Sequence, residues 1–306
     1  KGVGNYICLQ KMNSESPDPD GEVLLEVSSL GQDAKRLRAW AQTPDVTGDR
    51  DDAPDVDRRV WAANSLSGRE CVGADLCAYG SQCFAALAKG RAAQADVVVT
   101  NHTLLAIEIV DSHPILPERD AVILDEAHEF MDRTTQAVTE ELTGPRVSRA
   151  AAMARKYIPG KLADAFTKAA DDFNDAMDGF AQRVRTESNM QGRLVELPAE
   201  LEAPIRKVRE CAQAITQSFS ADEEIIDSDS IAERARVKGA VSEVSTTAAK
   251  LLKLGSGQVL WYEPTFSTLH LAPLTVSSVL RNNLLTKSPV IATSATLTVG
   301  KGFDAM

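Results

Sequence analysis

Two adjacent carboxylates and a histidine follow a short apolar run at residues 121–124. Asp125 and Glu126 come directly after this run, and His128 follows two residues later. The run has the composition of a buried strand, and α/β sheets bind ligands at the carboxyl ends of their strands. In a phosphoryl-transfer site, an Asp placed there holds Mg²⁺, and a following Glu orients or deprotonates the attacking water. The alternative is that the two carboxylates only begin the next helix, where they favour the helix dipole.

Small hydroxyl side chains follow a second apolar run near the end of the chain. Ser294 and Thr296 come straight after the strand-like residues 289–293. Hydroxyl groups at this place could relay a change at a bound nucleotide to a second lobe, or could simply cap a turn. These residues by themselves leave both interpretations open.

Four of the five cysteines form a second candidate site. Cys71, Cys77 and Cys83 are separated by five residues each, and Cys8 stands far upstream. An odd number of cysteines without a secretory signal argues against a disulfide framework. Structural zinc favours tight ligand pairs, whereas an iron–sulfur cube accepts thiolates from several directions. The spacing favours a cluster, with zinc and unliganded thiols as the alternatives. The fifth cysteine, Cys211, lies on the apolar side of a helical pattern and is expected in the core.

Short apolar strands beside helices predict how these residues are positioned. Helices are expected over residues 32–42 and 84–94, with a solvated acidic loop over 43–57 between them. A buried strand is expected over 95–99 and another over 121–124. Strands of this kind predict a parallel sheet covered on both faces.

The middle third has helical periodicity instead. Apolar residues repeat at four-and-three spacing over 166–184 and again over 237–251, which predicts long, packed helices. Strands return at 258–262 and 267–271, followed by a helix over 275–285 and the strand over 289–293. The predicted fold class is therefore α/β, with a helical insertion that interrupts the sheet.

Composition limits the class of protein. A length of 306 residues favours two domains, and 43% apolar residues is enough for a sizeable core. The formal charge, 33 − 44 = −11, argues against a surface coated in basic residues, although a local basic groove can still bind nucleic acid. No run approaches the roughly 18 apolar residues of a membrane span. We expect a cytoplasmic monomer without a membrane partner. Because the chain starts at Lys1, we read it as a piece of a longer protein.

Several segments carry a resemblance to a known family. In chain order they are Asn5–Cys8, Trp40-Ala41 with Thr47–Asp49, the cysteine trio, 95–102 (Ala-Asp-Val-Val-Val-Thr-Asn-His), Leu124–His128, Leu269–Pro273 and Thr293–Leu297. In this order they resemble the DinG/XPD family of superfamily 2 DNA helicases, and the bacterial DinG branch more than XPD. The resemblance spans nearly the whole chain and is weakest over residues 146–253.

The resemblance implies a RecA-like (P-loop NTPase) motor domain with two insertions. An iron–sulfur cluster domain would span 1–90, and a helical arch domain, including Arg234 and Arg236, would span 142–254. Motor domain 1 would supply 91–141 and 255–306. Such proteins use ATP and Mg²⁺ to move 5′ to 3′ along single-stranded DNA and to unwind forked or structured DNA, in DNA repair or replication-associated unwinding. A nucleoid-associated bacterial protein is implied.

The resemblance also assigns roles to single residues. Asp125 would hold Mg²⁺, Glu126 would be the catalytic base for water, and His128, Ser294 and Thr296 would couple hydrolysis to DNA movement. A 4Fe-4S cluster would be held by Cys8, Cys71, Cys77 and Cys83. Aromatic and basic side chains near the cysteines could stack on bases and meet phosphates, namely Tyr6, Tyr79, Phe84, Lys89 and Arg91.

One departure from the family matters. A motor of this class needs a Gly-x-x-x-x-Gly-Lys-Ser/Thr loop to cradle the phosphates, and the sequence contains none. The family places this loop before the first cysteine, so we expect it upstream of Lys1, with the second motor lobe beyond Met306. The leading hypothesis is a helicase fragment that is inactive by itself. The alternative is a stand-alone metal-containing nucleic-acid-binding or adaptor protein.

Overall fold

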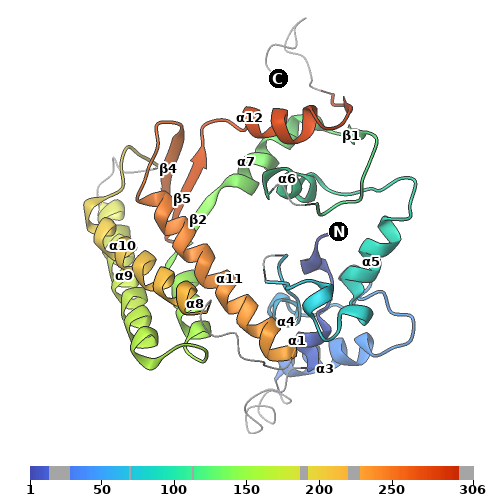
Figure 1. Ribbon diagram of the computed structural model, residues 1–306, viewed down its shortest axis with the longest axis horizontal. Coiled ribbons are helices and arrows are strands. Elements are labelled where there is room, and N and C mark those ends of the chain that lie inside the picture. The colour runs from blue at the N-terminus through green and yellow to red at the C-terminus, as the bar shows by residue number, and fades with distance from the viewer. Residues whose placement is uncertain (14–27, 69, 112–113, 187–191, 220–227, 296–306) are drawn as a thin grey trace, which may run out of the picture. The chain divides into compact units, whose positions relative to one another are not determined.

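The computed structural model describes residues 1–13, 28–68, 70–111, 114–186, 192–219 and 228–295 (Figure 1). These residues form a mixed α/β structure that is mostly helical and contains two small sheets. The chain divides into two compact units. The first comprises Lys1–Val99 and Ile226–Arg236, and the second comprises Thr100–Ile225 and Val237–Met306. Among the described residues, no helix is both long and apolar enough to cross a membrane.

The first unit is built from short helices joined by long loops. Its elements are η1 (Val3–Asn5), α1 (Leu9–Asn13), α3 (Ser29–Ala41), α4 (Arg58–Asn64), η2 (Ala74–Leu76), η3 (Gly80–Gln82) and α5 (Phe84–Ala92). Side chains cap two of these helices, because Ser28 accepts from the Gly31 N–H and Asp57 accepts from the Arg59 N–H. The core is small and consists of Ile7, Met12, Leu37, Ala41, Val60 and Trp61.

The strand predicted at 95–99 is not a strand. Val97 is 78% exposed and Val99 is 89% exposed, and the described backbone there pairs with no neighbour. A β-strand needs a hydrogen-bonded partner, and an apolar run without one stays in an irregular conformation. The expectation of a buried strand at this place was therefore wrong.

The second unit contains both sheets and most of the helices. Its helices are α6 (His102–Asp111), η4 (Ala127–Glu129), α7 (Phe130–Val138), α8 (Gly144–Ala154), α9 (Gly160–Thr186), α10 (Ala199–Ser218), most of α11 (Ser228–Leu251), α12 (Ser277–Leu280) and the π-helical turn η5 (Arg281–Leu285). Its strands are β1 (Val122–Leu124), β2 (Glu140–Thr143), β3 (Gly192–Leu194), β4 (Gln258–Glu263), β5 (Thr268–Pro273) and β6 (Val290–Ala292).

The larger core joins helices α8 to α11 to one face of an antiparallel sheet of order β2-β5-β4-β3. Figure 1 shows α9 and α10 lying side by side in this part of the unit. Phe166, Phe173 and Phe180 fill the interface as fully buried rings, spaced about two turns apart along α9. Cys211 is buried in the same core, with its Sγ 3.7 Å from the Ala165 carbonyl oxygen, as its apolar position predicted.

The smaller sheet pairs β1 with β6 in parallel, so that segments far apart in the sequence lie next to each other. Val122 and Leu124 point into a small core with Leu105, Phe130 and other apolar residues. Ile123 lies directly opposite Ile291, and these side chains are 70% and 56% exposed. The parallel pairing was expected, but the prediction that both faces are covered does not hold for the described residues.

Candidate motor and cysteine sites

The parallel register of β1 and β6 brings the two chemistry-bearing segments together. The N–H of Thr293 donates to the Leu124 carbonyl over 2.8 Å, and the N–H of Ala127 donates to the Thr293 carbonyl over 2.9 Å. These bonds continue the ladder past the ends of both strands. The residues that follow β1 and those that follow β6 therefore emerge from one edge of the sheet.

Side chains then connect the two segments directly. The Thr293 hydroxyl donates to Oδ1 of Asp125 over 2.9 Å. The Ser294 hydroxyl lies 3.3 Å from Oε2 of Glu126 and 2.8 Å from Nδ1 of His128. Asp125, Glu126 and His128 are exposed, so a ligand can reach them from solvent. Asp125, Glu126 and His128 thus each contact a residue of the second segment.

The backbone at Glu126 has a left-handed conformation, with φ = 50°. This conformation costs a non-glycine residue about 1 kcal/mol or more, so the fold must hold it in place. Glu126 precedes η4 but makes no side-chain cap bond to it. The carboxylate faces Ser294 instead, which argues against the alternative that this acid only begins a helix.

One contact at this edge goes beyond the sequence prediction. Thr293 was not among the candidate site residues, and only the strand register reveals its bond to Asp125. Thr296, by contrast, lies outside the described residues.

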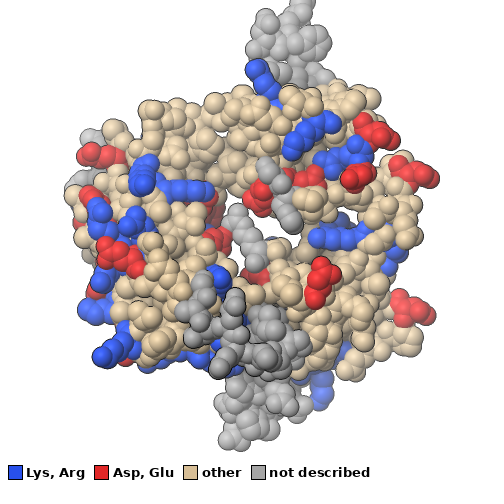
Figure 2. Space-filling view, in the orientation of Figure 1, with Lys and Arg blue, Asp and Glu red and all other residues tan. Residues whose placement is uncertain are grey.

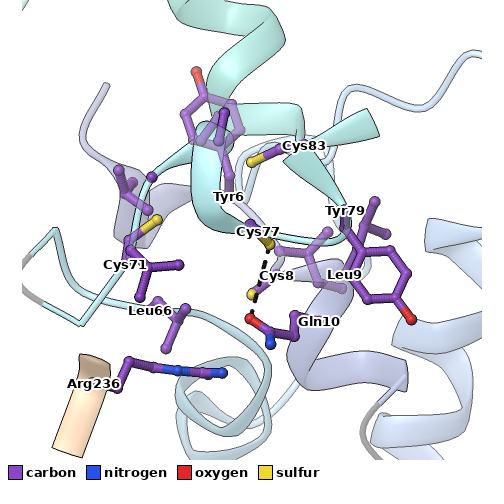
Figure 3. Close-up of a pocket in the computed structure, with 16 residues that line it drawn as sticks. Tyr6, Cys8, Leu9, Gln10, Leu66, Cys71, Cys77, Tyr79, Cys83 and Arg236 are labelled. Atoms are coloured by element: carbon purple, nitrogen blue, oxygen red, sulfur yellow. Dashed lines mark hydrogen bonds between the residues drawn. The ribbon is translucent and has the colours of Figure 1, made fainter. Parts of the chain in front are cut away.

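The four cysteines predicted to act together line one pocket of the first unit (Figure 3). The pocket is partly open to solvent, and all four cysteines are half-buried. Cys8 comes from the start of α1, whereas Cys71, Cys77 and Cys83 come from the loops before α5. The remaining lining is largely apolar and includes Leu9, Leu66 and Ala85.

Backbone contacts fix the position of Cys8. Its N–H donates to the Asn64 carbonyl over 2.8 Å at the end of α4, and Ile7 donates to the Gly48 carbonyl over 2.9 Å. Burial raises the pKa of the Cys8 thiol, while the backbone N–H groups of Lys11 and Gln10 and the charge of Arg236 oppose this rise. The sulfur thus faces donors that would stabilise a thiolate.

Each five-residue gap in the cysteine trio contains one 3-10 turn. The first gap contains η2 and the second contains η3, and both turns close with i to i+3 backbone bonds to Cys77 and Cys83. Gly73 enters the first turn with φ = 86°, a value that favours glycine. The five residues between successive cysteines therefore accommodate one turn each, and the turns place all three thiols around one pocket.

The predicted DNA-contacting residues fall into two groups. Tyr6 is buried against the cysteine pocket, and Phe84 is half-buried against Gly48 and the small core. Their contacts with bases stay predictions. Tyr79 is half-buried in the pocket lining. Lys89 and Arg91 are exposed in the last turn of α5, where they also favour the helix dipole. On the face drawn in Figure 2, basic and acidic side chains of the described residues are mixed.

The cysteine pocket can be tested against a single metal ion. Within the described ranges, no group of three or more Cys, His, Asp or Glu side chains is arranged to hold one ion. Thiolates bound to one tetrahedral zinc ion would have to lie about 3.8 Å apart, given Zn–S bonds of about 2.3 Å. The four thiols line one pocket, and cysteine thiols are donors for both zinc and iron–sulfur clusters.

Comparison with known proteins gives clear relatives, although no family model matches the chain. The chain is 34% identical over 328 residues to ATP-dependent helicase DinG of Mycobacterium tuberculosis, a match that covers all of this chain and 47% of the relative. It is 27% identical over 332 residues to ATP-dependent DNA helicase YoaA of Haemophilus influenzae, covering 99% of this chain and 48% of the relative. The YoaA helicase of Escherichia coli is 31% identical over 149 residues, covering 47% of this chain and 22% of that relative. The chain spans about half the length of the curated relatives that it matches end to end.

Proposed function

We propose that this chain, which is homologous along its whole length to ATP-dependent helicase DinG, is part of an ATP-dependent DNA helicase. In this proposal it contributes part of a RecA-like motor domain and an iron–sulfur domain. The helicase moves 5′ to 3′ on single-stranded DNA and unwinds forked or structured DNA. The observation that carries the proposal is the hydrogen-bonded link between the Asp125–His128 segment and the Thr293–Ser294 segment.

This link supports a nucleotide-coupling role for chemical reasons. Asp125 would hold Mg²⁺ and Glu126 would take the proton of the attacking water, as acids after a strand do in phosphoryl transfer. Ser294 touches both Glu126 and His128, so a change in the charge near Glu126 reaches β6 through one hydroxyl. Thr293, the residue directly after β6, donates a hydrogen bond to Asp125. Hydrolysis and the position of β6 are thereby connected.

The phosphate-binding part of such a motor would have to come from other residues. The 306 residues contain no Gly-x-x-x-x-Gly-Lys-Ser/Thr loop to bind the β- and γ-phosphates. The chain also spans about half of its relatives. We therefore expect the isolated chain not to hydrolyse ATP, and the helicase that contains it to do so.

The second part of the proposal is a 4Fe-4S cluster held by Cys8, Cys71, Cys77 and Cys83. The cluster would supply a covalent cross-link between the start of the chain and the trio, and a redox-active centre. The small core of this unit supports the need for such a cross-link, because a thin core stabilises a small domain poorly.

Substitution of Glu126 tests the motor part of the proposal. In the helicase that contains this chain, Glu126→Gln should lower DNA-stimulated ATP hydrolysis at least 100-fold, since a general base contributes about 10²–10⁴ in rate. Glu129→Gln is the matched control, because Glu129 is an exposed acid that pairs with Arg133. Equal rates for the Glu126 variant and the parent would contradict the base assignment. Hydrolysis by the isolated chain that requires Glu126 would show a phosphate site other than the expected loop.

A further inference from the structure

A charged side chain from a distant helix lines the cysteine pocket. Arg236 belongs to α11, and in Figure 3 it enters the pocket on the side of Leu66. It is half-buried and, by its contacts, belongs to the same compact unit as the cysteines. The sequence prediction placed this arginine on the helical arch, away from the cysteines. Its position at the pocket is therefore new information about the site.

Arg236 is the only cation among the described residues that line this pocket. The other lining side chains are apolar residues, small residues, two tyrosines, one glutamine and the four cysteines. An oxidised 4Fe-4S cluster with four thiolate ligands carries a net charge of about −2. Placing that charge in a largely apolar pocket is costly unless a positive charge or hydrogen-bond donors face it.

Arg236 shares the pocket with the proposed ligands themselves. Its side chain and all four cysteines line the same pocket, so its charge lies beside the place where thiolates would hold a cluster. An arginine suits this place because its charge is permanent and its hydration is weaker than that of an ammonium group.

A neutral side chain complements this charge on another ligand. Gln10 is buried at 7% exposure, and its Oε1 lies 3.8 Å from Sγ of Cys77, which donates to it as a thiol. Once Cys77 is a thiolate it can only accept, and a rotated Gln10 amide can present its N–H₂ group instead. The pocket can therefore supply donors to two of its four sulfurs.

We infer that Arg236 is a positioning residue of the cysteine site, which offsets the negative charge of the ligated cluster and sets its reduction potential. This inference rests on the cluster of the proposed function. A positive charge near the sulfurs favours the more negative, reduced form, so its removal lowers the potential. The helix that carries Arg236 continues without a break into the second unit, which ties α11 to the chemistry of the pocket.

Three variants of the anaerobically prepared chain test the inference. Arg236→Gln removes the charge, Arg236→Lys keeps it, and Arg234→Gln is a control on the same helix that does not line the pocket. We expect Arg236→Gln to change the ratio of reduced to oxidised cluster about tenfold at a fixed potential, a fall of about 59 mV for a one-electron couple. Loss of iron to a chelator should also become about tenfold faster. Arg236→Lys should recover most of both properties, and Arg234→Gln should match the parent.

The outcomes separate this inference from the proposal beneath it. If the parent chain contains no iron and sulfide, the proposed cluster is wrong, and so is the inference that rests on it. A parent with a cluster whose potential is unchanged in Arg236→Gln overturns the inference alone. If Arg236→Gln retains no cluster because α11 packs poorly, Arg236→Lys decides. A reduction potential and a rate of iron loss close to those of the parent chain support the role of the charge. A tenfold change in the rate of iron loss or in the ratio of reduced to oxidised cluster opposes it.

Discussion

Nδ1 of His128 lies 2.8 Å from Oγ of Ser294, although 166 residues separate them in the chain. The same hydroxyl lies 3.3 Å from the Glu126 carboxylate. A carboxylate can only accept, so the Ser294 hydroxyl donates in its contact with Glu126. Ser294 therefore connects the two segments through its contacts with Glu126 and His128.

Removal of the Ser294 hydroxyl should separate hydrolysis from movement. In the helicase that contains this chain, Ser294→Ala should lower DNA unwinding about tenfold more than ATP hydrolysis, since a hydrogen bond to a charged group contributes about 1.5–3 kcal/mol. Ser294→Thr keeps the hydroxyl and should retain the coupling. Parallel assays of unwinding and DNA-stimulated hydrolysis measure the ratio, with Ser288→Ala as the control. An equal fall in both rates would contradict the coupling role.

The stability of α4 should depend on pH through Asp57. The side chain and the backbone N–H of Arg59 hold the pKa of Asp57 at about 2, below its ordinary value of 3.8. Because the folded-state pKa is the lower one, the stabilisation is complete above pH 3.8 and is lost as the pH falls toward 2. Asp57→Asn should therefore lower the thermal midpoint at pH 7, and its difference from the parent should shrink below about pH 4.

The matched control for this measurement is Asp55→Asn. Arg36 donates to the backbone carbonyl of Asp55, so this contact survives the substitution. A difference between parent and Asp57→Asn that stays constant from pH 7 to pH 2 would assign the effect to the helix cap alone.

Binding of single-stranded DNA by the isolated chain should be weak and sensitive to salt. The net charge of −11 repels phosphate, and we expect the exposed cations Lys89 and Arg91 on α5 to lie near the bound DNA strand. Reversal of both charges should weaken binding and reduce the slope of log affinity against log salt by about 1.4 for two lost phosphate contacts. Fluorescence anisotropy over a salt series measures both effects.

The control for DNA binding has to lie away from the cysteines. Arg236 lines their pocket, so it is unsuitable, and Arg206 and Lys207 on α10 offer an adjacent exposed pair instead. Reversal of these two charges should change the affinity less than reversal at Lys89 and Arg91. The opposite ranking would move the DNA path to the helices of the second unit.

Long elements with strong periodicity were predictable from the sequence. The apolar stripe over 166–184 predicted the buried face of α9, because burial on one face of a helix requires that spacing. The apolar runs at 258–262 and 267–271 likewise predicted β4 and β5 to within a few residues. The apolar run at 95–99 failed because strand formation depends on a partner, which local composition does not specify.

Contacts between distant segments needed the structure. The bond from Thr293 to Asp125 follows from the register of β1 against β6, and no local pattern determines which strands pair. The apolar repeat that begins after Arg236 predicts only which face of the helix is buried. It could not predict that this charged side chain lines the cysteine pocket. The cysteine spacing suggested a shared site, and the two 3-10 turns explain how that spacing is used.

Single cysteine substitutions should separate ligands from core residues. Anaerobically purified chain should contain about four irons with matching sulfide, as the cluster type requires. Cys8→Ser should lose or destabilise the cluster, whereas Cys211→Ser should keep it, because Cys211 lies in the helical core of the second unit. Iron and sulfide assays and the visible spectrum report the result. Stoichiometric zinc without sulfide would contradict the cluster, and full iron retention in Cys77→Ser would contradict the ligand set.

The turn between Cys77 and Cys83 should tolerate no side chain at Gly80. A Cβ on Gly80 would lie 1.9 Å from the Ala74 carbonyl oxygen and 2.8 Å from its carbon, so the backbone of one turn must move. We expect Gly80→Ala to destabilise this unit by about 1–3 kcal/mol, the usual cost of overpacking, and to lower the iron content by displacing two ligands. Urea unfolding and iron assays measure the two effects.

Gly90→Ala is the control, because a Cβ there meets nothing within 4 Å and should stabilise α5 by about 0.5–1 kcal/mol. If Gly80→Ala and Gly90→Ala have the same stability and the same iron content, close packing of the two 3-10 turns is not needed for the cysteine site.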